Sequence, residues 1–301
     1  LMGINISTAA GPVINLSDVD PAVSALKRED FDFLTALLPS WAEPPMIVNT
    51  LMHFSNRPIL LWTLSSIKEK GVLIAPAGAA AMSAVMQPLK TMGFKIKMVF
   101  GNPDSDSVRS EIIRYAHVCE AVNRLSRSRI GIFGYADMGS YTAGFDQTSL
   151  RIKIGPEVED YEVHRLLLRA DEVKDEEADK FTMEQFRGWS IDKEVAKEDI
   201  RRAVKVYLAL KKIIDERSFS AVSMKCVYGL PIYYGITPCL PLALAGIEIP
   251  VVCECDVLGL VTELILDYIS GQRSVYLEFY DIFQDRILMG VCGMIPPLTL
   301  E

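Results

Sequence analysis

The sequence predicts an α/β protein with two open parallel sheets, followed by the beginning of a β-rich region. Short apolar runs alternate with longer helical stretches, which is the pattern of βαβ units. A new strand that ends in glycine begins after Ser128, as expected at the start of a second sheet. Near the end of the chain, residues 275–283 and 286–291 read as two strands with no helix between them. We therefore predict two Rossmann-like, flavodoxin-like domains over residues 1–128 and 129–271, and a β region over residues 272–301.

The first domain begins with a mixed apolar pattern over residues 31–38. Strands are predicted at residues 57–62, 72–76 and 95–101, where apolar residues cluster. Residues 79–92 are rich in helix formers and are interrupted only by Pro88. Residues 107–125 carry an apolar stripe with a charged opposite face, which predicts an amphipathic helix.

The second domain repeats this alternation. The charge-rich stretch 169–180 is predicted to be a solvated helix or connector. Residues 193–217 form the clearest helix, with acidic residues at its start and lysines later, as the helix dipole favours. Strands at 219–227 and 249–255 alternate with helices at 238–245 and 258–270, and Gly271 ends the last helix.

The charge and hydropathy of the chain indicate which kinds of binding partner to expect. The formal net charge of −8 would repel a nucleic-acid backbone, so we expect no nucleic-acid partner. No apolar run has the roughly 18 residues needed for a membrane span, and no secretory signal is visible, so we expect a cytoplasmic location. The chain begins with Leu1 and ends in Leu300-Glu301, and we expect it to be part of a longer protein.

Six cysteines lie mostly within apolar runs, and their spacing matches neither a CxxC motif nor a disulfide framework. This predicts buried, reduced thiols. The three histidines all lie far upstream of the cysteine-rich part, which argues against a zinc site. Gly78 lacks the rest of a G-x-G-x-x-G motif, so no dinucleotide is predicted.

Ligands of open α/β sheets bind at the carboxyl ends of the strands, so polar residues just after a strand are the candidates for function. Glu254 and Asp256 end an apolar strand, and the two-residue period of a strand would place both carboxylates on one face. Such a pair can bind a divalent cation or divide acid and base roles. Alternatively, Asp256 caps the next helix and Glu254 is solvated.

Lys225 follows another strand, and it can be a cation in a site, a Schiff-base lysine or a residue whose stem packs at the sheet edge. Thr237 and Cys239 begin a helix whose free N–H groups can hold a polar ligand, or Thr237 is an ordinary cap. Tyr141 and Tyr228 lie in the segments after two of the strands. We predict Lys225, Tyr228, Thr237, Cys239 and Tyr141 as substrate-binding residues.

Several segments together resemble a known family. They are residues 134–142 with Phe145-Asp146, residues 223–226, residues 237–240, residues 249–256 and the helix that ends at Ser270-Gly271. In order and spacing they resemble the middle domain of L-fucose isomerase and L-arabinose isomerase-like proteins, over roughly residues 130 to 293.

The resemblance implies a sugar (aldose–ketose) isomerase of carbohydrate metabolism, an intramolecular oxidoreductase that forms a homo-oligomer and has a C-terminal β-barrel domain. It implies a cofactor Mn²⁺ or another divalent cation that assists proton transfer between C1 and C2 of a small sugar or polyol. Asp256 matches the metal-ligating aspartate and Glu254 is its acidic neighbour, so both are the predicted catalytic residues.

The sequence also departs from the family's pattern. No Asp or Glu lies between Glu216 and Glu248, and Cys239 lies about where a metal-ligating glutamate is expected. No histidine follows His164, although the family takes a metal histidine from its last domain. The alternative prediction is therefore a non-catalytic sugar-binding or assembly protein that has lost the metal site.

Overall fold

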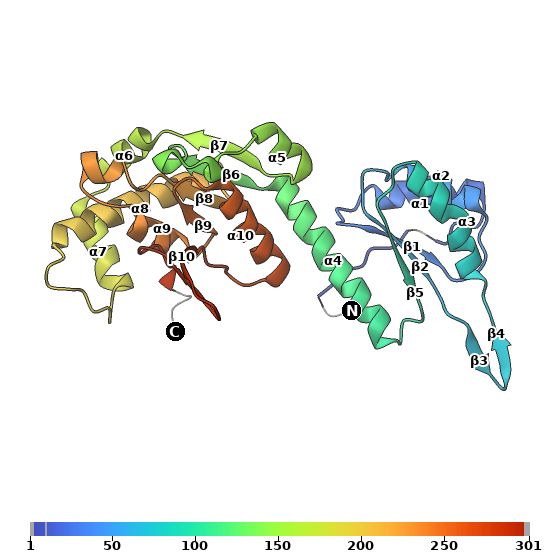
Figure 1. The fold of residues 1–301 in the computed structure, drawn as a ribbon. Coiled ribbons are helices and arrows are strands. Elements are labelled where there is room, and N and C mark those ends of the chain that lie inside the picture. The colour runs from blue at the N-terminus through green and yellow to red at the C-terminus, as the bar shows by residue number, and fades with distance from the viewer. Residues whose placement is uncertain (1–2, 10, 298–301) are drawn as a thin grey trace. The chain divides into compact units, whose positions relative to one another are not determined.

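The computed structural model describes residues 3–9 and 11–297. The chain divides into two compact units, Leu1–Asn123 and Arg124–Glu301, and the division falls within the long helix α4 (Asp106–Arg127). Both units carry a parallel sheet flanked by helices, which confirms the predicted α/β class (Figure 1). None of the helices among the described residues is both long and apolar enough to cross a membrane.

The first unit contains a three-stranded parallel sheet in the order β1-β2-β5. Its strands are β1 (Leu34–Leu38), β2 (Ile59–Thr63) and β5 (Ile96–Phe100). The helices before α4 are α1 (Val19–Leu26), α2 (Pro44–Met52) and α3 (Gly78–Thr91), and a short η1 (Leu16–Asp18) precedes α1. Buried residues of α1, α2 and α3 pack against the sheet to form the core of this unit.

Helix α3 begins very close to the carboxyl edge of that sheet. A Cβ atom on Gly78 would collide with Thr63 Oγ1 and with the carbonyl oxygen of Leu38. Only a residue without a side chain permits this approach. The packing of α3 on β1 and β2 therefore depends on Gly78.

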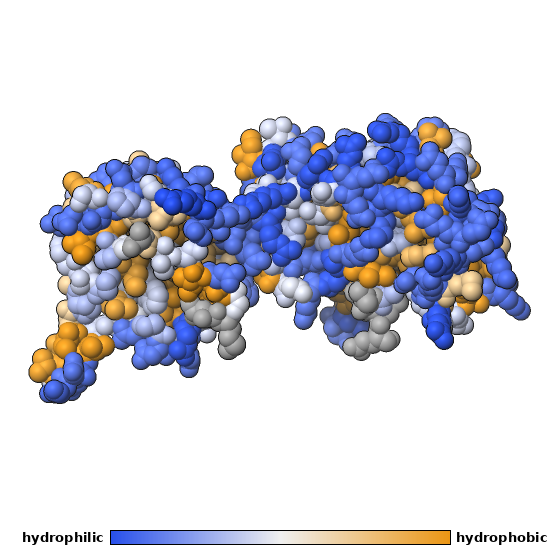
Figure 2. Space-filling view, turned by 180° about the vertical axis from the view of Figure 1, so that it is seen from behind, coloured by the Kyte–Doolittle hydropathy of each residue, from blue (hydrophilic) through white to orange (hydrophobic). Residues whose placement is uncertain are grey.

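The predicted strand at 72–76 does not join the parallel sheet. Instead, β3 (Ile67–Glu69) and β4 (Val72–Ile74) pair antiparallel as a projecting hairpin. Its apolar side chains are exposed, and Figure 2 shows them as a hydrophobic patch at the lower left. An apolar run alone does not distinguish a buried strand from an exposed ribbon, which explains the difference.

The second unit contains a four-stranded parallel sheet in the order β7-β6-β8-β9. Its strands are β6 (Arg129–Phe133), β7 (Glu157–Tyr161), β8 (Ala221–Met224) and β9 (Val251–Cys253). Its helices are α5 (Gln147–Lys153), α6 (Val163–Asp171), α7 (Asp175–Gln185), α8 (Lys197–Arg217), α9 (Cys239–Ala245) and α10 (Val257–Ser270). Two short 3₁₀ helices, η2 (Asp137–Gly139) and η3 (Tyr141–Ala143), and a short π-helix, η4 (Leu230–Tyr234), lie in the loops.

Alternate residues of each strand point to opposite faces of this sheet, so it has a core on both sides. On one face, Phe133, Val222 and Met224 pack against α6, α8 and α9. On the other, Ile132 and Val252 pack against α5 and α10. The charge-rich stretch predicted at 169–180 becomes the end of α6 and most of α7, and its carboxylates pair with α8, as in the 2.8 Å contact between Asp179 Oδ1 and Arg201 Nε.

The two strands predicted near the C-terminus are present as β10 (Glu278–Ile282) and β11 (Ile287–Gly290), which pair antiparallel. The last four residues of the predicted β region lie outside the described residues. The predicted domain limits at residues 128 and 271 stay predictions.

Candidate functional site

The strand order of the second sheet creates a natural binding crevice. The chain leaves β6 to form β7 on one side and later forms β8 on the other side, so β6 and β8 flank the point where the order reverses. In open α/β sheets, ligands bind outside the carboxyl ends of the strands at this switch point. The loops after β6 and β8 are therefore the first place to look for chemistry.

Asp137, four residues beyond β6, is fully buried at this switch point. Its Oδ2 accepts the backbone N–H groups of Cys226 and Val227, at 2.9 and 2.7 Å. Its Oδ1 accepts the N–H of Met138 and lies 3.2 Å from Lys225 Nζ. Burial alone would raise the pKa of Asp137, but these donors outweigh it, so the pKa lies below its usual value.

Lys225, the first residue after β8, is held as a cation in this setting. It is 8% exposed, and its Nζ lies 3.5 Å from the centroid of the Tyr135 ring. Burial lowers its pKa, but contacts with Tyr135 and Asp137 outweigh burial, and the net pKa lies above the usual lysine value. Of the three predicted roles, the structure favours a fixed ammonium group, because a Schiff-base lysine must first lose its proton.

Gly134 makes this packing possible. Its φ of +115° is a backbone conformation that side chains disfavour, and a Cβ there would lie 2.9 Å from Lys225 Cβ. The glycine at the end of β6 thus allows the neighbouring strand end to place its lysine directly beside it.

A cavity of about 400 Å³ opens next to Lys225. This volume lies in the range of small-molecule sites. Its polar lining comes from the ends of β6, β7 and β8, namely Tyr135, Asp160, Glu162, His164, Lys225 and Tyr228. Two predicted substrate-binding residues, Lys225 and Tyr228, therefore line the same cavity.

Glu254 and Asp256 do not line this cavity, and they are arranged differently from the strand geometry expected of them. Strand β9 ends at Cys253, and Glu254 and Cys255 have left-handed φ angles of 62° and 57°. The prediction that strand periodicity puts both carboxylates on one face was therefore wrong, because the strand stops before either residue.

Asp256 is the N-cap of α10. Its Oδ1 accepts the N–H of Gly259 at 3.0 Å, and the hydroxyl of Tyr276 donates to its Oδ2 at 3.5 Å. Glu254 is half-buried. Burial raises its pKa, and the negative charges of Glu278, Asp137 and Asp256 raise it further. The catalytic roles predicted for Glu254 and Asp256 stay predictions.

The remaining predicted substrate-binding residues lie apart from the cavity lining. Tyr141 is fully exposed in η3, and Thr237 is exposed before α9. Cys239, the first residue of α9, has its thiol in hydrogen-bond contact with Cys292. The sequence analysis missed Asp137 as a site residue, although its position just after β6 was the available signal.

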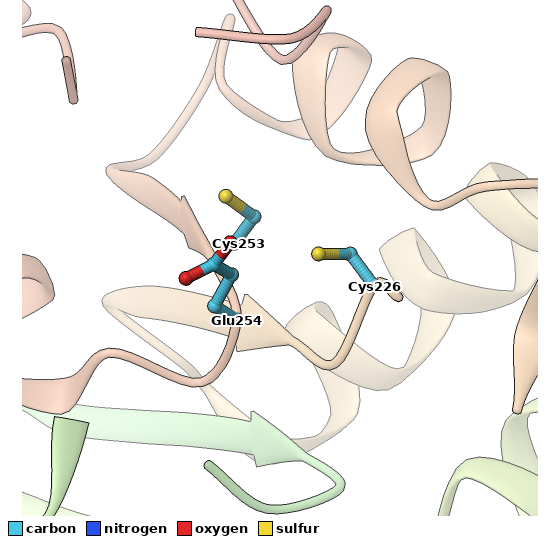
Figure 3. A group of neighbouring side chains, drawn as sticks. All are labelled: Cys226, Cys253 and Glu254. Atoms are coloured by element: carbon cyan, nitrogen blue, oxygen red, sulfur yellow. The ribbon is translucent and has the colours of Figure 1, made fainter. Parts of the chain in front are cut away.

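A second cluster lies at the neighbouring carboxyl edge of β8 and β9. One donor atom each from Cys226, Cys253 and Glu254 lies within 4.8 Å of the others (Figure 3). The thiol of Cys253 lowers the pKa of Cys226 through a hydrogen bond, and that contact together with burial raises the pKa of Cys253. Within residues 3–9 and 11–297 this is the one gathered group of three such ligands.

This donor set differs from the one that Mn²⁺ prefers. Two of its three atoms are sulfur, whereas Mn²⁺ favours oxygen and imidazole ligands. Asp256, the predicted manganese ligand, is not part of the gathered group. The residues brought together here therefore do not fit a manganese centre.

In sequence, the chain is distantly similar to sugar isomerases. No family model matches it. It is 22% identical over 231 residues to a sulfoquinovose isomerase of Alkalicoccus urumqiensis, covering 73% of this chain and 49% of the relative. It is 21% identical over 282 residues to sulfoquinovose isomerases of Priestia aryabhattai and Priestia megaterium, covering 91% of this chain and 61% of each relative. The chain thus spans about half to three-fifths of the length of these curated relatives, and its similarity is to proteins named as sugar isomerases.

Proposed function

We propose that the chain belongs to an aldose–ketose isomerase that binds a small sugar in the cavity between the ends of β6, β7 and β8. The observation that carries this proposal is the buried Lys225–Asp137 pair, whose Lys225 lines the cavity at the switch point. The similarity to sulfoquinovose isomerases supports the reaction class. The predicted homo-oligomer and cytoplasmic location are part of the same proposal.

Interconversion of an aldose and a ketose moves a proton between C1 and C2 while negative charge develops on the carbonyl oxygen. A fixed ammonium group beside that oxygen stabilises the charge, which is the role proposed for Lys225. Asp137 holds the ammonium in place through the 3.2 Å contact and needs no contact with sugar. The other hydroxyl groups of the sugar would form hydrogen bonds with Asp160, Glu162 and Tyr228 in the cavity lining.

Transfer of the proton requires an acid–base side chain within reach of the sugar. Glu254, a catalytic residue predicted from the sequence, is the proposed proton carrier, and burial together with the surrounding carboxylates raises its pKa. Its backbone is fixed beside the Lys225–Asp137 pair, since its carbonyl oxygen accepts the N–H of Asp137 at 3.0 Å. Glu254 follows β9 and lies outside the cavity lining, so this role requires the sugar to extend to the β9 side of the crevice.

The test offers sulfoquinovose, L-fucose and L-arabinose as substrates. Nuclear magnetic resonance monitors the conversion of each aldose to its ketose. Lys225→Met is expected to lower kcat/KM by about 100- to 1,000-fold, the usual cost of removing one charge-stabilising donor. Lys193→Met, on an exposed loop before α8, is the matched control and should retain activity.

Two results would overturn the proposal. Saturable binding of one of these sugars without any ketose would support the non-catalytic sugar-binding alternative. Equal activity of the Lys225→Met and Lys193→Met proteins would show that the chemistry lies elsewhere.

A further inference from the structure

The pairing of β8 with β9 brings two cysteines and a glutamate together. Met224 and Cys253 are register partners in the parallel ladder, so the residues just beyond them share one edge of the sheet. Cys226 lies two residues beyond β8, and Glu254 directly follows β9. Figure 3 shows the side chain of Cys226 projecting toward the end of β9, where Cys253 and Glu254 lie.

We propose that Cys226, Cys253 and Glu254 bind a thiophilic divalent cation of the zinc class. Cysteine sulfur selects such ions, and zinc accepts two thiolates and one carboxylate in a tetrahedral site. Three protein ligands leave the fourth position for water or another small ligand. The proposal concerns metal binding and is tested without sugar. It shares Glu254 with the proposed function, and a Glu254 carboxylate that is bound to the cation does not act as the proton carrier.

The spacing of the donors fits this ion. Zinc–sulfur bonds of about 2.3 Å hold two sulfur ligands of a tetrahedron roughly 3.8 Å apart. The three donor atoms already lie within 4.8 Å of one another. Binding therefore requires the two sulfur atoms to approach by no more than about 1 Å and the carboxylate oxygen by slightly more, which small rotations of the three side chains can supply.

The ligand-bearing backbone is fixed before any ion binds. Asp137 accepts the N–H of Cys226 with its buried carboxylate and donates its own N–H to the carbonyl oxygen of Glu254. Partners outside the ligand set that orient the ligands in this way are typical of metal sites. Cys226 and Cys253 are 8% and 3% exposed, so the sulfurs are shielded from solvent, whereas Glu254 is half-buried.

Binding of the cation releases protons from the two cysteines. Both cysteines must lose their protons to become ligands, because the thiolate and not the thiol binds the metal. One ion displaces up to two protons into solvent, and no electron is transferred. Binding is therefore expected to strengthen as pH rises.

The experiment titrates the reduced, metal-free protein with Co²⁺, which reports sulfur ligation by a charge-transfer absorption band in the near ultraviolet. One Co²⁺ per chain should produce this band, Zn²⁺ should displace it, and an equal concentration of Mn²⁺ should not. Cys226→Ser and Cys253→Ser should each weaken Co²⁺ binding by at least about tenfold. Cys255→Ser is the matched control, because that buried thiol donates to the carbonyl oxygen of Phe133, a bond that serine can also make.

A second measurement covers variants that fail to fold. In the wild-type chain, at a low urea concentration that transiently exposes buried thiols, Zn²⁺ should slow the alkylation of Cys226 and Cys253 while leaving the exposed Cys292 reactive. Absence of the charge-transfer band, or equal alkylation of Cys226 and Cys253 with and without Zn²⁺, would overturn the proposal. A disulfide between Cys226 and Cys253 that reforms after reduction, with no metal uptake, would overturn it as well.

Discussion

Lys225 and Asp137 form a buried ion pair across the ends of two neighbouring strands, with 3.2 Å between Nζ and Oδ1. The carboxylate is fully buried and the lysine nearly so. A buried charge is tolerated when it is paired and hydrogen-bonded, and Asp137 meets both conditions through three backbone N–H groups and one ammonium. Each member of the pair therefore depends on the other.

Removing the charge of Asp137 should destabilise the second unit. Asp137→Asn leaves the Lys225 ammonium buried without its counter-charge, at a cost of about 3 to 5 kcal/mol in the free energy of unfolding. Urea denaturation measures this. Glu177→Gln, which breaks an exposed pair with Lys212, is the control and should cost less than about 1 kcal/mol. Equal effects of the two substitutions would contradict the prediction.

The pair also has a pH signature. Because the pKa of Asp137 is lower in the folded chain than its unfolded value of 3.8, its stabilisation is complete above pH 3.8. That stabilisation is lost as the pH falls through the folded pKa. The free energy of unfolding of the wild-type protein, measured with urea, should thus fall more steeply between about pH 5 and 2 than that of Asp137→Asn. Parallel curves for the two proteins would assign the acid sensitivity to other carboxylates.

For Glu263 we expect the opposite pH dependence, with stability lost as the pH rises. Burial, aided by the charge of Asp267, raises its pKa from 4.5 to about 8, and its Oε1 has no hydrogen-bond partner among the described residues. A raised folded pKa gives stability that is complete below pH 4.5 and is lost as pH rises through about 8. Glu263→Gln should remove this loss and flatten the pH dependence of the unfolding free energy between about pH 4.5 and 8, whereas the exposed Glu184→Gln should not.

Two substitutions at Asp256 separate its structural role from its proposed chemistry. Asn caps a helix about as well as Asp, so Asp256→Asn should keep the stability of α10 within a few tenths of a kcal/mol. Asp256→Ala removes the bond to Gly259 and should cost about 1 kcal/mol. Loss of isomerase activity in the stable Asn variant would assign a functional role to the carboxylate, and full activity would restrict Asp256 to capping.

Gly78 provides a test in the first unit. Gly78→Ala places a methyl group against Thr63 and the backbone of Leu38, and overpacking of this kind costs about 1 to 3 kcal/mol. Gly11→Ala is the matched control, because a Cβ there meets nothing within 4 Å. Thermal unfolding of the two variants compares them directly, and a loss of stability confined to Gly11→Ala would contradict the prediction.

Much of the architecture could be predicted from periodicity and helix signals. The helices α4, α8 and α10 lie within a few residues of their predicted limits, because long amphipathic or capped segments carry strong local information. The hairpin of β3 and β4 was misread as part of the parallel sheet, since a short apolar run does not specify its partner strand.

The candidate site was only partly accessible from the sequence. Lys225 and Tyr228 were found because each follows a strand, and parallel strands end at one edge. Strand periodicity failed at Glu254 because left-handed φ angles at residues 254 and 255 turn the chain out of the strand. The cluster of Cys226 with Cys253 was invisible because 26 intervening residues separate them in the sequence, and only the register of β8 with β9 brings them together.

The hydrogen bonds of Asp137 give the two proposed sites a common support. Its carboxylate contacts Lys225 at the cavity and the N–H of Cys226 beside the thiol cluster, and its own N–H contacts Glu254. A ligand of the cavity that displaced Lys225 would therefore also disturb the backbone that carries Cys226 and Glu254. If both proposed ligands bind, thermodynamic reciprocity requires that each change the affinity for the other by the same factor.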